Sequence, residues 1–495
     1  MTTFPPRRHY LPPLAVTRTR GTSLAHQIYA GLQQAMTSGQ LRAGQPLPST
    51  RALAAELRVS RMPVLEAFAR LHAEGYIEAL RGSGTRVAAL PAAGAAPPLS
   101  AGAGRARPRT VSRAAARARQ VPPQPWHELR GAFRACLPAL DHFPVALWAR
   151  LVARNARALP TPSLAYGDPM GYAPFRAVLA EYLRAARGVR CEAGQIMTVA
   201  GSQQGLQLAA RVLVNPGDTV WIEEPGYSGA QHALAAAGAR LVPVPVDQDG
   251  LRVEEGIRRA PRARAVYITP SHQFPLGTTM SARRRLELLQ WAARAGAWVI
   301  EDDYDSEYRF GAHPLPALQG LDAAARVIYL GTCSKVLAPA LRVGYLVLPP
   351  DLVDAFARVR DGLDIFPSPL VQAALADFIR EGHFARHLRR MRGLYQERYA
   401  VLAEELAHRL GPRQEVVSAP AGMHLCVLLP PGSSDLAVAH AGVCIGLALQ
   451  PLSLYYLRRP RAGLVLGFGT VAPAEIRART ADLARLLGSE VGRSG

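Results

Sequence analysis

Lys335 is the only lysine in a sequence whose lysine and arginine residues together number 58. Arginine can replace most surface lysines because either side chain keeps a positive charge in water, but arginine stays protonated under ordinary conditions. A buried lysine can lose its proton, and the neutral amine can then form a Schiff base with a carbonyl group. The lone lysine therefore indicates chemistry with a carbonyl cofactor. The alternative is chance survival in an arginine-rich chain.

Four other residues have the chemistry to bind a phosphate near this lysine. Thr332 and Arg342 flank Lys335 and can offer a hydroxyl and a bidentate guanidinium. Ser202 and Gln203 open a predicted helix just after a predicted strand, where exposed amides and the helix dipole favour an anion. Many strand–helix turns look alike, so a phosphate site is indicated only if all four residues lie close together in the fold.

Acidic and aromatic residues could bind the ring of the same cofactor. Glu301–Tyr304 follows the apolar run Ala297–Ile300, so Asp302 could hold a pyridinium proton and Tyr304 could bond a phenolate oxygen. Tyr227 could stack on the ring. The alternatives are a helix cap or solvated turn for the acidic residues and a core position for Tyr227.

The pattern from Glu128 onward predicts the α/β elements that would position these residues. Strand-like runs alternate with helical runs, which is typical of a mostly parallel sheet with ligands at the carboxyl ends of its strands. The predicted strands are 195–199, 219–222, 240–244, 265–269, 297–301, 327–330 and 344–348. The predicted helices between them include 203–214, 229–237 and 283–294.

The N-terminal segment predicts a winged helix-turn-helix. Apolar residues recur every four positions over 23–36, a second helix spans 51–57 with Ser49 as its cap, and Ser60 caps a third. Short strands at 76–79 and 85–88 flank a glycine-containing turn. The third helix would enter the major groove by its N-terminus. The alternative is a small helical interaction domain.

The distribution of charge supports a polyanion partner for this segment. Residues 1–127 hold 17 arginines and four glutamates, which gives +13 of the chain's +21. We expect Ser60 and Arg61 to reach the groove, Arg51 to meet a phosphate, and the amides of Gly82–Gly84 to approach another.

The cysteines and the hydropathy exclude other classes of protein. The five cysteines are scattered without a C-x-x-C pair, so we expect neither a disulfide framework nor a metal site. No apolar run approaches the roughly 18 residues of a membrane span. We expect a cytoplasmic protein that associates with the nucleoid when bound to DNA.

The sequence predicts a flexible linker at 90–127 between a DNA-binding domain at 15–89 and a large domain at 128–495. The linker is rich in alanine, proline and arginine, and no acidic residue occurs between Ala79 and His127. It is either a solvated spacer or an arm that adds nonspecific phosphate contacts. A transient helix over 114–119 is a further alternative.

One stretch of the first domain closely resembles the DNA-binding domain of GntR-type bacterial regulators: LPSTRALAAELRVSRMPVLEAFARLHAEGYIEALRGSGTRVA. The resemblance implies DNA contacts at Arg51, Ser60, Arg61 and the wing, which comprises Gly82, Ser83, Gly84 and Thr85. Leu65 stands where some members carry an additional DNA-contacting arginine.

The segment from about Phe133 to Leu487 resembles a fold type I aminotransferase domain, and the combination resembles the MocR-type branch of the GntR family. The matching stretches include LAYGDPMGYAPFR, VAGSQQGLQLAARVLVNPGDTVWIEEPGY, IEDDYDSEYRF and GTCSKVLAPALRVGYLVLP. The resemblance implies pyridoxal 5'-phosphate as the cofactor. Lys335 would form an internal aldimine with it.

The same resemblance implies roles for the other site residues. Asp302 would hold the pyridine nitrogen, Tyr304 the ring hydroxyl, and Tyr227 would stack on the ring. Tyr166 matches a tyrosine that reaches the phosphate of a partner subunit, which implies a homodimer. The phosphate would be bound by Ser202, Gln203, Thr332 and Arg342.

Two positions depart from the aminotransferase pattern. Phe274 stands where an asparagine usually bonds the ring hydroxyl, so His272 or Gln273 would have to compensate. Val465 stands where an arginine usually binds the substrate α-carboxylate. The candidate replacements for that arginine are Arg458, Arg459 and Arg461.

These observations predict a transcriptional regulator that binds operator DNA and senses pyridoxal phosphate, an amino compound, or both. Because the carboxylate-binding arginine is absent, we expect half-reactions at best and little sustained turnover. The alternative is a working aminotransferase that carries an accessory DNA-binding domain.

Overall fold

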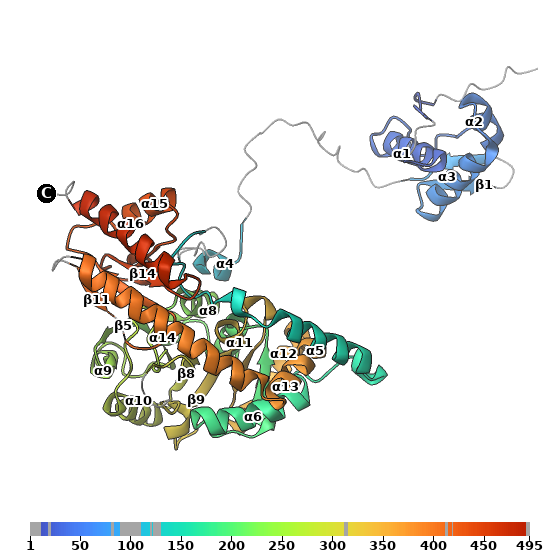
Figure 1. Ribbon diagram of the computed structural model, residues 1–495. Coiled ribbons are helices and arrows are strands. Elements are labelled where there is room, and N and C mark those ends of the chain that lie inside the picture. Colours follow the sequence, from blue (N-terminus) through green and yellow to red (C-terminus); the bar gives the residue numbers. More distant parts are fainter. Residues whose placement is uncertain are drawn as a thin grey trace, which may run out of the picture. The chain divides into compact units, whose positions relative to one another are not determined.

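The computed structural model describes residues 11–17, 21–80, 84–89, 110–118, 121, 130–310, 315–410, 414–417 and 419–491. The chain divides into two compact units, Met1–Arg109 and Thr110–Gly495 (Figure 1). No helix in the described ranges is long and apolar enough to cross a bilayer.

The first unit has the predicted order of three helices and a hairpin. Its buried core is built from apolar side chains of all three helices, such as Ile28, Leu53 and Val64. Strands β1 and β2 pair antiparallel, with Leu80 opposite Gly84. The elements are α1 (Leu24–Thr37), α2 (Thr50–Glu56), α3 (Arg61–Ala73), β1 (Ile77–Leu80) and β2 (Gly84–Val87).

The helix caps of this unit follow the prediction in position but not in every bond. The hydroxyl of Ser49 accepts a hydrogen bond from the Ala52 amide at 3.2 Å, as a capping serine should. Ser60 also occupies the cap position of its helix, α3, but its exposed hydroxyl makes no capping bond.

Part of the predicted linker is helical. Helix α4 (Arg113–Ala118) packs against α8 (Ser228–Ala236), and an Arg117 guanidinium nitrogen lies 3.4 Å from the Gly238 carbonyl oxygen. Through this contact α4 belongs to the second unit, which begins at Thr110. Apart from 110–118 and Val121, the predicted linker lies outside the described residues.

The second unit is built on an eight-stranded sheet of described strands in the order β3-β10-β9-β8-β7-β4-β5-β6. β4 pairs parallel with β5 and β7, and β8 pairs parallel with β7 and β9, whereas β10 runs antiparallel to both of its neighbours. The bounds are β3 (Ile196–Val199), β4 (Thr219–Glu224), β5 (Arg240–Asp247), β6 (Gly250–Leu251), β7 (Ala265–Ile268), β8 (Trp298–Asp303), β9 (Val327–Thr332) and β10 (Gly344–Val347).

Helices cover both faces of this sheet, because its strands are apolar on both sides. In β7, Tyr267 packs into the core under α7 (Ser202–Leu213), α8 and α12 (Val353–Asp364), whereas Val266 packs into the core under α9 (Val253–Arg259) and α10 (Ala282–Ala295). β3, β4, β8 and β9 all run in the same direction in this sheet, so their carboxyl ends meet at one edge of it.

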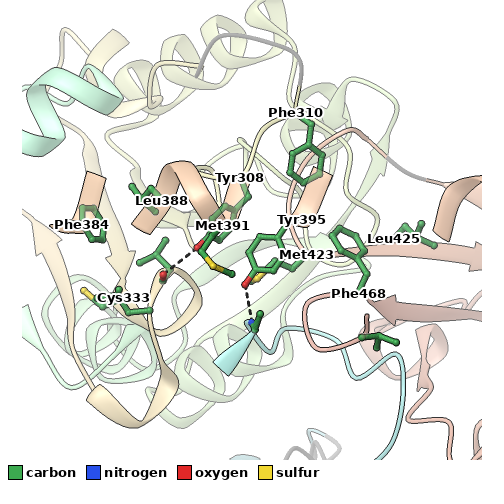
Figure 2. Packing of buried hydrophobic residues seen from close by; sticks show 14 of the residues in the cluster. Tyr308, Phe310, Cys333, Phe384, Leu388, Met391, Tyr395, Met423, Leu425 and Phe468 are labelled. Atoms are coloured by element: carbon green, nitrogen blue, oxygen red, sulfur yellow. Dashed lines mark hydrogen bonds between the residues drawn. The ribbon is translucent and has the colours of Figure 1, made fainter. Parts of the chain in front are cut away.

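A smaller antiparallel sheet follows, in the order β11-β12-β14-β13, with the 27-residue helix α14 beside it. Buried aromatic rings join the two parts, and Figure 2 shows Tyr308, Tyr395 and Phe468 among them. The remaining elements are α5 (Val145–Ala158), α6 (Ala173–Arg187), α11 (Cys333–Val336), α13 (Pro369–Arg380), α14 (His383–Arg409), β11 (Glu415–Val417), β12 (His424–Leu428), α15 (Asp435–Cys444), β13 (Gln450–Pro451), β14 (Gly463–Gly467) and α16 (Pro473–Val491).

Candidate functional site

A cavity of about 320 Å³ lies where β3, β8 and β9 end. It brings together eight of the nine residues predicted to bind the cofactor: Lys335, Asp302, Tyr304, Tyr227, Ser202, Gln203, Thr332 and Arg342. The eight residues lie between positions 202 and 342 of the chain, and they meet here because the parallel strands place their carboxyl ends at one edge of the sheet.

Tyr166 is the ninth predicted residue, and it does not line the cavity of its own chain. Its side chain is 83% exposed, and its ring meets Phe366 edge-on at 6.2 Å between centroids. A role in a partner subunit's site stays a prediction.

Lys335 lies in α11, the short helix that follows β9 directly. Its Nζ donates a hydrogen bond to the Cys136 carbonyl oxygen at 2.7 Å. The Tyr308 hydroxyl donates to the Val336 carbonyl oxygen from the core behind the helix (Figure 2). His387 Nε2 lies 3.0 Å from the same oxygen, and burial lowers the pKa of His387 to about 4. The neutral ring must therefore carry its proton on Nε2, and these two donors hold the helix in place.

Asp302 lies inside β8 rather than beyond its end, because the strand ends at Asp303, two residues later than predicted. Its Oδ2 accepts a hydrogen bond from Tyr267 Oη at 2.9 Å, whereas its buried Oδ1 has no partner in the described part of the chain. Burial raises the pKa of Asp302 to about 7, although the Tyr267 bond opposes this. A cationic N–H donor in the cavity would satisfy the orphaned oxygen and stabilise the carboxylate.

Three aromatic side chains, those of Tyr227, Phe274 and Tyr304, also line the cavity. Phe274 meets Tyr227 and Tyr304 edge-on, with centroids 5.9 Å and 6.1 Å away. The Tyr304 hydroxyl lies 3.1 Å from His272 Nδ1. Neither His272 nor Gln273 lines the cavity. Neither side chain is therefore placed to bond the ring hydroxyl in the way the usual asparagine does. Gln273 instead donates to backbone carbonyls such as that of Pro225.

The start of α7 and Arg342 form the positively charged end of the cavity. Gly201 precedes the helix with a φ of +88°, and an added Cβ there would lie 2.8 Å from Arg342 Nη2. Arg342 donates to the Ala200 carbonyl oxygen, while Ser202 and Gln203 form the first turn. Bare amides at a helix start beside a guanidinium fit a phosphate.

One wall of the cavity is a loop that was not predicted from the sequence, and it supplies Arg134, Ala135, Cys136 and Leu137. Phe133 and Cys136 have φ values of +68° and +62°, an unusual conformation for residues other than glycine. No motif marked this loop. Its composition offers only the cation of Arg134 as a signal.

The three candidate replacements for the carboxylate-binding arginine lie elsewhere. Arg458, Arg459 and Arg461 line a separate cavity with Glu224 and Glu415. Val465 is fully buried in β14, where it pairs with Cys426 and Gln450. None of these residues lines the cavity around Lys335.

His272, Asp305 and His424 form a buried cluster close enough to hold a metal ion, with possible ligand atoms within 4.8 Å of one another. His272 Nδ1 lies 3.1 Å from both Asp305 oxygens, and His424 Nε2 lies 3.1 Å from the Pro275 carbonyl oxygen. These bonds give the cluster a hydrogen-bonding role between the cavity wall and the smaller sheet.

In the first unit, Arg51, Ser60 and Arg61 are all exposed, as a DNA-contacting surface requires. Arg61 Nε donates to Thr50 Oγ1 at 3.2 Å, which brings the starts of α2 and α3 together. In the predicted wing, Gly84 has a φ of +82° and Thr85 follows it in β2, whereas Gly82 and Ser83 lie outside the described residues.

Family models match both units. Residues 24–87 match bacterial regulatory proteins of the gntR family, and residues 141–455 match aminotransferase class I and II. The chain is 43% identical to a probable rhizopine catabolism regulatory protein MocR of Rhizobium meliloti, over 94% of both chains. It is 32% identical to the pyridoxine biosynthesis transcriptional regulator PdxR of Corynebacterium glutamicum, over 92% of this chain and 94% of that one.

A solved structure supports the fold of the second unit. The α-aminoadipate aminotransferase LysN of Thermus thermophilus, complexed with N-(5'-phosphopyridoxyl)-L-leucine, aligns with a TM-score of 0.71 and 29% identity. The alignment covers 77% of this chain and 98% of LysN.

Proposed function

The chain belongs to the MocR-type branch of the GntR family of bacterial transcriptional regulators, and on this premise we propose that its second unit senses pyridoxal 5'-phosphate, an amino compound, or both. The protein is a DNA-binding regulator with an aminotransferase-like domain. As a protein that binds chromosomal DNA, it would act in the cytoplasm.

The orphaned Oδ1 of Asp302 is the observation that carries the cofactor assignment. A buried carboxylate oxygen without a donor costs free energy, and a protonated pyridine nitrogen is the donor that would remove this cost. When bound, pyridoxal phosphate supplies an aldehyde that reacts reversibly with amines. Lys335 would hold the cofactor covalently, and it is the one side-chain amine of this chain.

The other cavity residues would hold the cofactor without reacting with it. Tyr227 would stack on the ring, and Tyr304 would bond its hydroxyl. The arrangement fits a phosphate at the opposite end, where the positive end of α7 and a guanidinium converge. The four phosphate-binding residues would be Ser202, Gln203, Thr332 and Arg342.

Attachment of the cofactor would engage the Lys335 Nζ, which otherwise donates to the Cys136 carbonyl oxygen, and an incoming amine that takes over the cofactor would free Nζ to donate there again. The loop that contains Cys136 would therefore lose this anchor in one state and hold it in the other. A ligand can change DNA binding only by the difference in its affinity for two states of the protein. We expect the two states to differ in this loop, because the ligand changes the bond between Lys335 and Cys136.

We also propose that the protein is a homodimer through the face that carries Tyr166. Two other large apolar side chains between positions 145 and 166 are also exposed, Val145 at 66% and Leu164 at 74%. Exposed apolar side chains of this size commonly mark an interaction surface where they form a contiguous patch. The dimer would place Tyr166 of each chain near the partner's phosphate.

The runner-up function is a working aminotransferase. It is favoured by Lys335 and Asp302, which would suffice for an amine to react with the cofactor. It is disfavoured by Val465, which leaves no arginine at the usual place for a substrate α-carboxylate.

The decisive experiment measures operator binding as a function of ligand. Genome-wide binding would first identify an operator, and fluorescence anisotropy would then give the Kd of that DNA with and without pyridoxal phosphate, for the wild type and Lys335→Ala. A ligand-dependent Kd in the wild type alone supports the proposal. An unchanged Kd with every ligand, together with sustained transamination, would promote the runner-up.

A further inference from the structure

His272 is a buried histidine that contacts the cofactor-binding residue Tyr304 from outside the cavity. Its Nδ1 lies 3.1 Å from the Tyr304 hydroxyl oxygen and 3.1 Å from each carboxylate oxygen of Asp305. The side chain of Asp305 is buried as well. Because Tyr304 is the residue assigned to the ring hydroxyl of the cofactor, the groups that orient its hydroxyl bear on cofactor binding.

The contacts of Nδ1 decide where the proton of the imidazole ring lies. Carboxylate oxygens accept hydrogen bonds, so Nδ1 must carry a proton and donate it toward Asp305. A bare Nδ1 would instead set its lone pair against two carboxylate oxygens. A doubly protonated ring also has a proton on Nδ1. In either charge state of His272, Nδ1 therefore cannot accept a hydrogen bond from Tyr304.

The opposite edge of the ring agrees with this assignment. His272 Nε2 is buried and has no hydrogen-bond partner in the described part of the chain. His272 also lines a small cavity with Ser306 and Arg309, whose Oγ and Nε are likewise buried without a partner there. Both of those groups can donate, so an unprotonated, accepting Nε2 suits this side better than a further N–H.

These bonds turn the proton of the Tyr304 hydroxyl away from His272. The hydroxyl oxygen accepts from Nδ1–H, which leaves the O–H free to donate elsewhere. Tyr304 lines the cavity, and the neighbouring Phe274 ring, 6.1 Å away between centroids, offers no acceptor. Burial and the Asp305 carboxylate raise the pKa of Tyr304 well above the ordinary tyrosine value, so the hydroxyl keeps its proton. A negatively charged ring oxygen in the cavity would accept that proton.

Two glycines leave room for this arrangement and confine it. A Cβ added at Gly422 would collide with His272 Cε1 and would lie 2.7 Å from Asp305 Oδ2. Gly422 has a φ of +71°, and its amide donates to the Tyr308 carbonyl oxygen at 2.6 Å. A Cβ added at Gly277 would lie 3.2 Å from His272 Nε2. The imidazole ring is therefore held against Asp305 with little room to rotate.

We propose that His272 and Asp305 are positioning residues, which direct the hydroxyl proton of Tyr304 toward the ring hydroxyl of the cofactor. Asp305 fixes a proton on His272 Nδ1, and Nδ1–H occupies the Tyr304 oxygen from behind. The inference rests on the proposed binding of pyridoxal phosphate. It also compensates for Phe274, which stands where an asparagine usually bonds the ring hydroxyl, because the remaining donor has a fixed direction.

The test compares pyridoxal phosphate with 3-deoxypyridoxal 5'-phosphate, which lacks the ring hydroxyl. Equilibrium dialysis gives the Kd of each compound for the wild type and for each variant. The ratio of the two Kd values measures the preference for the hydroxyl. Comparing this ratio between variants cancels the different reactivity of the two compounds toward Lys335. Visible absorbance of the bound compound verifies that the cavity of each variant is formed.

Tyr304→Phe should lose at least about tenfold of the preference, as expected for a hydrogen bond to a charged group. His272→Phe should lose most of the same amount, because the hydroxyl is no longer held toward the cavity. His272→Asn should retain the preference, because its amide nitrogen takes the place of Nδ1 and still donates. In the Tyr304→Phe background, His272→Phe should cause no further loss, since both act through one hydroxyl.

Asp305→Asn tests the other positioning residue and is nearly isosteric, so it decides the question if His272→Phe fails to fold. An amide can either accept from Nδ1–H or donate to a bare Nδ1, so it no longer fixes the proton there. The variant should therefore lose part of the preference for the ring hydroxyl.

The pH dependence of the cofactor absorbance is a second readout, which a merely structural role would not move. A donor to the ring oxygen stabilises its negative charge most when the Lys335 nitrogen has lost its proton. The donor therefore lowers the pH at which the absorbance changes. Tyr304→Phe and His272→Phe should each raise that midpoint by about one pH unit, whereas His272→Asn should keep it near the wild-type value.

His424→Gln is the matched control. His424 belongs to the same buried cluster, but its Nε2 donates to the Pro275 carbonyl oxygen at 3.1 Å, and glutamine keeps a donor for that oxygen. The control should keep the wild-type preference and midpoint. A loss equal to that of His272→Phe would mean that packing of the cluster is responsible, and the positioning role would be refuted.

The remaining outcomes separate this inference from the proposed function. Wild-type protein that binds neither compound would end the cofactor assignment, and the inference would fall with it. Equal binding of the two compounds by the wild type would leave the cofactor in place and refute the hydroxyl contact. If Tyr304→Phe loses the preference while His272→Phe and Asp305→Asn keep it, Tyr304 binds the ring without help from either residue.

Discussion

Asp302 reaches the cavity from β8 and Lys335 from α11, the helix that follows the adjacent strand β9, and each depends on the chain around it for its reactivity. The unpaired oxygen of Asp302 lowers the free energy of unfolding until a hydrogen-bond donor binds in the cavity. The lysine is held at the Cys136 carbonyl from a helix that the core fixes from behind. The residue-scale predictions concern these two side chains.

Lys335→Ala should abolish covalent attachment of pyridoxal phosphate, since the alanine variant has no side-chain amine at all. Purified wild-type protein should show visible cofactor absorbance, and reduction with borohydride should fix the cofactor to the peptide that contains Lys335. Mass spectrometry after digestion checks this. Covalent cofactor found on the alanine variant would refute the assignment.

Asp302→Asn should change how the stability of the second unit depends on pH in the absence of cofactor. The folded-state pKa of about 7 lies above the ordinary carboxyl value, so the folded state holds a proton that the unfolded chain has lost. Stability of the wild type should therefore fall as pH rises from about 4 through 7, whereas the asparagine variant lacks this contribution.

Between pH 5 and 8 the wild type should lose about 2–3 kcal/mol relative to Asp302→Asn. Denaturant unfolding followed by tryptophan fluorescence isolates the right unit, because all five tryptophans follow residue 109. Saturation with pyridoxal phosphate should remove the loss in the wild type. Parallel pH curves for the two proteins would contradict the buried, proton-holding state of Asp302.

At the scale of elements, the start of α3 is the part of the first unit that could read a sequence. Arg61→Ala should weaken binding to the preferred operator by about 1–3 kcal/mol if the guanidinium contacts a guanine edge. Random duplex should lose much less. Electrophoretic mobility shift with both DNAs at one salt concentration checks this, and equal losses would mean that Arg61 contacts only phosphate.

Elements with a local pattern were predictable from the sequence. The large sheet is buried on both faces, so runs such as 265–269 stood out, and the observed β7 lies within that prediction. Ser49 capped its helix as expected. The end of β8 was misplaced because an acidic pair such as Asp302 and Asp303 reads as a strand end, although both are buried inside the strand.

The loop at Arg134 was not predictable, because its place depends on contacts far along the chain. Its shape is set by pairing with residues near Gly446 and Gly467, more than 300 positions away. No periodicity or motif encodes such a contact. The eight cavity residues were found because they lie at strand ends and helix starts, where local chemistry and fold coincide.

At the scale of the whole molecule, the proposed dimer makes each cofactor site a product of two chains. Tyr166→Ala alone should weaken cofactor binding, and Lys335→Ala alone should abolish attachment. Mixed dimers should recover one complete site, in which the lysine of the first variant meets the tyrosine of the second. Absorbance of co-purified, differently tagged chains checks this. No recovery in verified heterodimers would remove Tyr166 from the partner's site.

The whole protein should turn over common amino acids poorly. Without an arginine at position 465, an α-amino acid would be held in a geometry unsuited to repeated proton transfer at its α-carbon. Keto-acid production, measured with a coupled dehydrogenase, should stay well below roughly 1 per second. Multiple turnovers at or above that rate would contradict this prediction and support a working aminotransferase.

Because the chain has a single lysine, the fraction of chains that carry the cofactor can be measured by proteolysis. A protease that cuts only after unmodified lysine has one cleavage site in the denatured chain and would release residues 1–335 and 336–495. Lysine fixed to the cofactor by reduction is no substrate, so the uncut fraction on a gel would equal the fraction of chains that carried cofactor. Such a readout needs no chromophore and could be applied to protein drawn directly from cells.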